Sequence, residues 1–163
     1  MKYILFTFLI LSLKTAAQDC QLFRETDPYT KETKLSSGFV RLQGASLSMD
    51  ANKLEIDFLF SLEGRDKCFT DASTAAVFFE GSKVKFTQRN SGSMNCEGFF
   101  HFIFRNNNSI PSLLQKMSTQ KLSKIVFTGN DKRETMVSLS AEQQKIVMDL
   151  ATCMVKEAPT IIK

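Results

Sequence analysis

Alternation of hydrophobic and polar residues marks several segments of the chain and predicts β-strands. The clearest segment spans residues 53–62, and its apolar positions are Leu54, Ile56, Phe58, Phe60 and Leu62. A period of two is typical of a strand that buries one face and exposes the other. Residues 38–43 have the same pattern, whereas the polar stretch 18–37 predicts a loop that continues into an edge strand.

A β-hairpin is predicted where two further strands meet at a turn. The segments TAAVFFE (74–80) and KVKFTQ (83–88) flank Gly81-Ser82, which is a pair typical of a tight hairpin turn. The hydrophobic stretch FFHFIF (99–104) is apolar on both faces apart from His101, and this pattern predicts a central strand buried on both sides. Two more strands are expected at 123–127 and 135–139.

Two helices are predicted in the second half of the chain. Pro111 suits the first turn of a short helix that reaches about Gln120. Ser140 and Gln143 form a capping box at the start of a longer helix that ends near Glu157. Residues at helical spacing should form its buried stripe: Ile146, Val147, Leu150, Cys153 and Met154.

These elements together predict an α+β fold. We expect an antiparallel β-sheet or sandwich of about seven strands, with a short middle helix and a C-terminal helix packed on the sheet. Residues 18–163 are long enough for one ordinary domain with a single core. The sequence therefore predicts a single disulfide-stabilised α+β domain after residue 17.

The first 17 residues, Met1–Ala17, have the pattern of a signal peptide. Lys2 precedes a mostly apolar run from Tyr3 to Leu13, and small residues follow at 15–17. The apolar run is shorter than the ~20 residues that span a bilayer. The protein is therefore predicted to be exported, to the periplasm or the extracellular space, with no stable membrane anchor after cleavage. Gln18 and Asp19 before Cys20 disfavour a lipoprotein.

Four cysteines, Cys20, Cys68, Cys96 and Cys153, follow the signal peptide. An even number in an exported chain predicts two disulfides, for which three pairings exist. The hairpin at 74–88 brings the neighbourhoods of Cys68 and Cys96 together, and this favours their pairing and leaves Cys20 for Cys153. Free thiols remain the alternative, because the spacings contain no C-x-x-C motif and no neighbouring histidine pair for a metal.

Net charge gives little indication of a nucleic-acid partner. The whole chain has 21 Lys and Arg residues, of which the signal peptide carries Lys2 and Lys14, so 19 basic residues face 17 acidic ones in the mature chain. Acidic or aromatic residues interrupt each basic group. The sequence predicts no nucleic-acid partner.

Residues with catalytic potential are few. His101 is the only histidine, and it comes with neither a metal-binding partner nor a serine-hydrolase motif. Glu55 and Asp57 share one strand face about 7 Å apart, an arrangement that solvent exposure explains. Asp66 and Asp71 match no calcium loop. We therefore predict no catalytic residue, no metal ligand and no cofactor, and a structural role for His101.

Phenylalanine is unusually frequent, with 15 residues and no tryptophan. Seven lie on predicted strands and suit either core packing or a pocket for a hydrophobic ligand: Phe58, Phe60, Phe78, Phe86, Phe100, Phe102 and Phe104.

Residues from about 78 to 155 resemble small exported proteins of unknown function from Gram-negative bacteria. The matching segments are Phe78-Phe79-Glu80-Gly81 with Lys83–Phe86, Asn95-Cys96-Glu97-Gly98-Phe99-Phe100, Lys121–Phe127 and the final helix with Cys153. The resemblance implies export and a sheet with a terminal helix, and it transfers no functional residue.

The sequence thus predicts an exported, noncatalytic binding or interaction module whose partner is an unknown protein or a small hydrophobic ligand. The alternative is a carrier that holds a hydrophobic small molecule in a Phe-lined pocket. A third hypothesis is an enzyme that uses carboxylates or His101, and it requires these groups to converge in a cleft.

Overall fold

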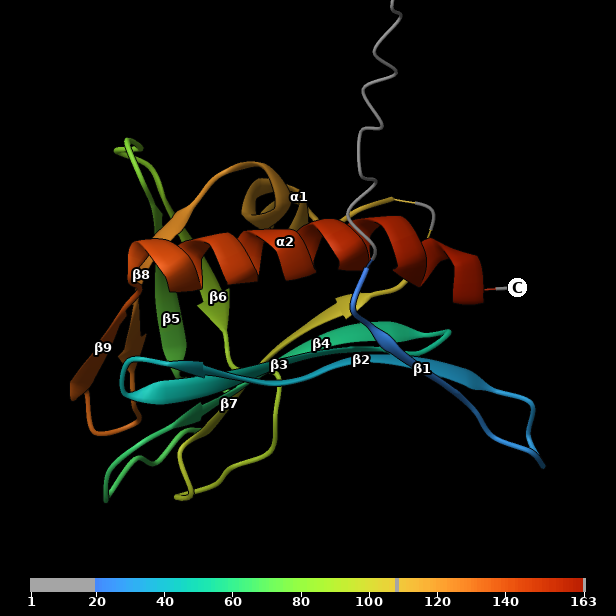
Figure 1. Ribbon diagram of the computed structural model, residues 1–163. Coiled ribbons are helices and arrows are strands. Elements are labelled where there is room, and N and C mark those ends of the chain that lie inside the picture. Colours follow the sequence, from blue (N-terminus) through green and yellow to red (C-terminus); the bar gives the residue numbers. More distant parts are fainter. Residues whose placement is uncertain (1–19, 108, 163) are drawn as a thin grey trace, which may run out of the picture.

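The computed structural model describes residues 20–107 and 109–162, so the predicted signal peptide lies outside the described residues. The chain folds into two antiparallel sheets with two α-helices above them (Figure 1). The strands are β1 (Phe23–Thr26), β2 (Thr33–Leu42), β3 (Ala45–Ala51), β4 (Glu55–Leu62), β5 (Thr74–Phe79), β6 (Lys85–Arg89), β7 (Phe99–Arg105), β8 (Leu122–Thr128) and β9 (Glu134–Ser138). The helices are α1 (Ser112–Thr119), α2 (Ala141–Glu157) and the short 3-10 helix η1 (Ala158–Ile161).

The strands are arranged in a five-stranded sheet of order β1-β2-β3-β4-β7 and a four-stranded sheet of order β6-β5-β8-β9. Every pairing between neighbouring strands is antiparallel. The predicted α+β class with a short middle helix and a packed C-terminal helix is therefore confirmed. The described residues contain nine strands rather than about seven.

Strand β3 has no counterpart in the sequence prediction, although it lies in the middle of the five-stranded sheet. Alanine and serine, which have little intrinsic preference for strands, hide its alternation. Pairing on both sides with β2 and β4 holds it in place. Gly44, with a φ of 79°, provides the tight turn from β2 into β3.

Strand β7 is an edge strand, so the prediction of a central strand buried on both sides is wrong. Its free edge is covered by the segment 90–95 instead of by another strand. The Ser91 N–H donates to the His101 carbonyl at 3.0 Å, and the His101 N–H donates to Asn90 Oδ1 at 2.9 Å. This partial cover protects the free edge of β7 from unwanted pairing with another strand.

The core is one hydrophobic cluster that both sheets and both α-helices share. Seven phenylalanines are almost completely buried within it: Phe58, Phe60, Phe69, Phe79, Phe100, Phe102 and Phe127. Their rings pack on one another, for example Phe60 on Phe102 with ring centroids 5.0 Å apart. Four of the seven phenylalanines that the sequence placed on strands, Phe58, Phe60, Phe100 and Phe102, thus fill the interior.

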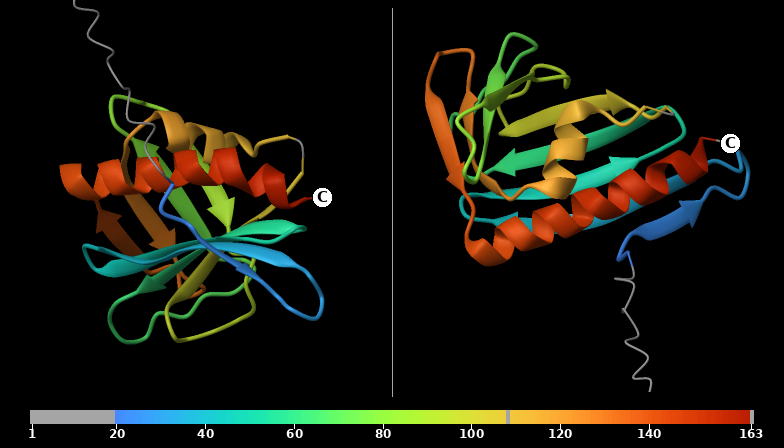
Figure 2. Two further views of the ribbon diagram at one scale, coloured as in Figure 1. Left: turned by 45° about the vertical axis from the view of Figure 1, so that its right-hand side comes forward. Right: turned by 90° about the horizontal axis from the view of Figure 1, so that it is seen from above.

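Helix α2 lies across the inner faces of both sheets, next to α1 (Figures 1 and 2). The predicted capping box is present, because the Gln143 N–H donates to Ser140 Oγ and the Ser140 N–H to Gln143 Oε1. The predicted stripe needs one correction. Ile146 is 36% exposed, and Ala151 is buried in the helix instead.

The start of β4 also differs from the prediction. Leu54 is 68% exposed, because the chain is still turning there. Asn52 Oδ1 accepts the N–H groups of Leu54 and Glu55, so an Asx turn sets where the strand begins.

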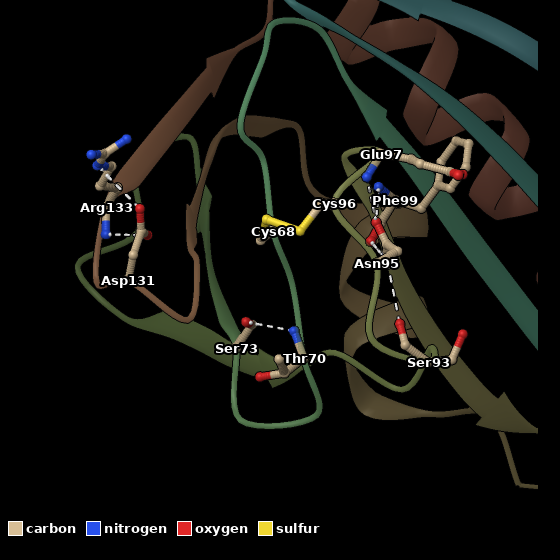
Figure 3. Close-up of a disulfide and its surroundings, with 10 residues drawn as sticks. All are labelled: Cys68, Thr70, Ser73, Ser93, Asn95, Cys96, Glu97, Phe99, Asp131 and Arg133. Carbon is tan, nitrogen blue, oxygen red and sulfur yellow. Dashed lines mark hydrogen bonds and ion pairs between the residues drawn. A yellow bond between two sulfur atoms is a disulfide. The ribbon is translucent and has the colours of Figure 1, made fainter.

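Two disulfides, Cys20–Cys153 and Cys68–Cys96, join distant parts of the chain. The pairing is the one that the hairpin at 74–88 favours. Beyond the β5–β6 ladder, Phe69 and Asn95 exchange two backbone hydrogen bonds of 2.8 and 3.0 Å. This bridge extends the hairpin alignment to the adjacent cysteines (Figure 3).

Within residues 20–107 and 109–162, no helix is long and apolar enough to cross a membrane.

Candidate binding site

The five-stranded sheet has an outer face that points away from α1 and α2 (Figure 1). A groove of about 390 Å³ lies on this face, at the end where β1 pairs with β2. We call it the outer groove, and its charged and aromatic lining consists of Phe23, Glu25, Lys34, Asp50, Glu55 and Asp57.

Strand register places these side chains on one face. Ser36 of β2 pairs with Asp50 of β3, and Asp50 pairs with Asp57 of β4. Paired residues point to the same side of a sheet, so the two aspartates are direct neighbours. A β-bulge between Ser36 and Phe39 allows both of these residues to face outward on β2.

Asp57 is held by the histidine of β7. Its Oδ2 lies 2.8 Å from His101 Nδ1, and each side chain is 25% exposed. The other carboxylate oxygen, Oδ1, is buried and accepts no hydrogen bond from the described residues. Leaving a buried acceptor unpaired costs about 1–3 kcal/mol, so Asp57 lines the outer groove at the expense of stability.

Burial raises the pKa of the Asp57 carboxyl above its ordinary value. The hydrogen bond and the charge of His101 oppose this shift, whereas the negative charges of Asp50 and Glu55 add to it. The net effect is that the surroundings disfavour the ionised form of Asp57.

Asp50 has a partner of its own within β3. The Ser48 hydroxyl, on a residue only 4% exposed, donates to Asp50 Oδ2 at 2.6 Å. Sequence analysis missed both residues because it missed their strand. Ser46, Ser48 and Asp50 alternate with apolar residues, and this alternation indicates a strand that would have placed Ser48 and Asp50 on one face.

His101 positions Asp57 and does not line the outer groove. The segment 90–92 lies against its ring, and a Cβ added to Gly92 would come within 2.5 Å of His101 Cδ2. Thus the structure brings Glu55, Asp57 and His101 to one sheet face, whereas the third hypothesis required them to converge in a cleft, and it places Asp66 in a separate depression beside Arg133. Within residues 20–107 and 109–162, no three His, Cys, Asp or Glu residues are grouped to hold a metal ion.

Replacing Asp57 with asparagine is expected to raise the free energy of unfolding at neutral pH by about 1 kcal/mol, because it removes a charge that the half-buried site disfavours. The pKa of Asp57 in the folded protein lies above the ordinary 3.8, so the unfolded chain loses this proton at a lower pH than the folded protein does. The free energy of unfolding therefore falls as the pH rises from 3.8 through the folded-state pKa. Below that window both states are protonated, so the advantage of Asp57→Asn should disappear. Urea unfolding at neutral and acidic pH measures this difference.

Glu80→Gln, which removes one negative charge from the hairpin of the other sheet, is the control for net charge. A loss of stability in Asp57→Asn at neutral pH would mean that attraction to His101 outweighs the burial of the carboxylate.

A scan with protein-family models, a search of curated proteins and a search of solved structures each gave no match. The resemblance to small exported proteins therefore stays a prediction from the sequence.

Proposed function

We propose that this protein is an exported, noncatalytic binding module that holds its partner in the outer groove. The observation that carries the proposal is the group of like charges in the groove lining, where Asp50 lies directly opposite Asp57 and Glu55 lies two positions before Asp57 on the same strand face. Like charges directly opposite each other on a sheet reduce stability, and residues that reduce stability are commonly retained where function requires them.

The positions of the polar groups favour binding over catalysis. His101 uses Nδ1 for Asp57, and Gly92 lies against the opposite edge of its ring. Ser48 donates to Asp50 instead of to the histidine. A nucleophile and its base need a mutual hydrogen bond, and here each polar group is engaged in holding a groove carboxylate.

Packing of the phenylalanines favours the binding module over the hydrophobic carrier. Phe58, Phe60, Phe100 and Phe102 are fully buried among other core residues. Phe86 packs edge-on against Phe79, and Lys124 lies over the ring of Phe78. These rings are engaged with protein neighbours, whereas the outer groove is open and has five charged side chains in its lining.

Export is part of the proposal and is supported by the two disulfides. Structural disulfides persist in oxidising compartments, whereas reducing systems of the cytoplasm keep most thiols free.

A nuclear magnetic resonance titration of the isotope-labelled chain 18–163 tests this function. The probes are a lysine-rich peptide, a glutamate-rich peptide, a maltose oligomer and lauric acid. At least one probe should cause saturable amide shifts centred on the groove positions of β2, β3 and β4. Shifts confined to the phenylalanine core would favour the carrier, chemical conversion of a probe would favour an enzyme, and no saturable shift at the groove would refute the proposal.

A further inference from the structure

The outer groove has a local charge opposite to that of the chain. The full chain carries a formal charge of +4, yet four acidic residues and one lysine line the groove. Lys34 lies directly opposite Glu25 in the β1–β2 pair, so the negative charge of Glu25 offsets the positive charge of Lys34. Asp50, Glu55 and Asp57 remain as the acidic surface, and such a concentrated charge attracts a cationic partner.

Other basic groups lie near this acidic surface without neutralising it. Arg105 of β7 is the register partner of Glu55, but the two side chains form no ion pair in the described part of the chain. Lys53, in the turn before β4, pairs with Glu32. His101 is bound to Asp57 Oδ2 and Asp57 Oδ1 is buried, so Asp57 attracts a cationic partner through its charge and not through a free oxygen atom.

The carboxylates have the spacing of an extended peptide. Glu55 and Asp57 are two positions apart on β4 and point to the same face, which separates them by about 7 Å. Alternate side chains of an extended peptide have the same separation. Two lysines at alternate positions would therefore match the two acids.

Exposed phenylalanines suit the apolar part of a lysine side chain. Phe23, 72% exposed, lines the outer groove, and Phe39, 67% exposed, lies opposite Ser48 on the same face. Lysine combines a hydrophobic stem with an ammonium group, so the stem can cover a ring while the charge meets a carboxylate.

We infer that the outer groove binds an extended segment of a partner protein that carries lysines at alternate positions. The inference rests on the proposed function and names its partner class. The ammonium groups meet Asp50 and Glu55, the charge of Asp57 adds to their attraction, and the lysine stems pack against Phe23.

Calorimetric titration of the chain 18–163 with a hexapeptide of alternating lysine and threonine tests this inference. Acetylating the lysines should weaken binding at least about tenfold, since each charge-assisted contact is worth roughly that factor. High salt should also weaken binding. Glu55→Gln and Asp50→Asn should each weaken binding by about tenfold, and Phe23→Ala should weaken it to a smaller extent.

Glu80→Gln is the matched control, since it changes net charge equally on the hairpin of the other sheet, and it should leave the affinity unchanged. Equal weakening by Glu80→Gln would indicate general charge attraction and would overturn the inference. Binding of the maltose oligomer or the glutamate-rich peptide in the outer groove, without the lysine peptide, would also overturn it while leaving the proposed function standing. No saturable binding of any probe there would refute both.

Discussion

Replacing Phe127 with alanine is expected to lower the free energy of unfolding by about 3–5 kcal/mol. Phe127 belongs to β8 of the four-stranded sheet, and its ring centroid lies 5.3 Å from that of Phe60 and 5.1 Å from that of Phe100. Both partners belong to the five-stranded sheet. Phe127 therefore joins the two sheets, and truncation leaves a cavity that rigid strands on both sides cannot easily close.

Phe39→Ala is the matched control, because Phe39 has the same side chain on an outer strand face and is 67% exposed. Its stability should change by less than about 0.5 kcal/mol. Urea unfolding followed by circular dichroism measures both variants. A loss of about 1 kcal/mol or less in Phe127→Ala would mean that the sheets shift together and refill the space.

Local sequence signals predicted the elements whose residues act on their immediate neighbours. The capping box of Ser140 and Gln143 formed as expected, because both hydrogen bonds lie within one helical turn. The hairpin at 74–88 likewise depends on a turn of a few residues. Once this hairpin was located, its alignment was enough to favour the Cys68–Cys96 pair that the structure contains.

Elements that depend on distant partners could not be assigned in the same way. Strand β3 consists of residues with modest strand preference and is held by β2 and β4. Strand β7 has the composition of a central strand, but the segment 90–95 occupies the place of its second neighbour. A hydrophobicity pattern indicates that a residue is buried, but it does not indicate which element buries it.

The candidate site escaped sequence analysis for the same reason. Glu55, Asp57 and His101 were recognised separately, and the strand containing Asp50 was not. Their proximity arises from the register of β3, β4 and β7, which are separated by loops of different length. The interpretation of Asp57 as a solvent-exposed residue was incomplete, because the neighbouring strand brings His101 beside it and leaves Oδ1 buried.

Removal of the Cys20–Cys153 disulfide by the double change Cys20→Ser and Cys153→Ser should lower the free energy of unfolding more than removal of Cys68–Cys96. The first bridge closes a sequence separation of 133 residues and the second one of 28. Restriction of the unfolded chain contributes about 5 kcal/mol for a loop of the first size and about 3.5 kcal/mol for the second. Urea unfolding of the two double variants under nonreducing conditions measures the difference.

The long-range bridge also bears on the proposed function. Cys20 lies three residues before β1, a four-residue edge strand with exposed side chains. Phe23 and Glu25 of β1 form one wall of the outer groove. Without the bridge to α2, only pairing with β2 and contacts such as the Arg24–Glu157 ion pair hold this wall.

The Cys20 and Cys153 double variant should therefore bind the lysine peptide more weakly even under conditions in which most molecules remain folded. The Cys68 and Cys96 double variant is the matched control, because its bridge lies in the loops beyond β5 and β6, away from the groove lining. A greater loss of stability in the control variant would contradict loop entropy as the main contribution of the bridges. Equal peptide affinity in both variants would show that β2 alone is enough to hold β1 in place.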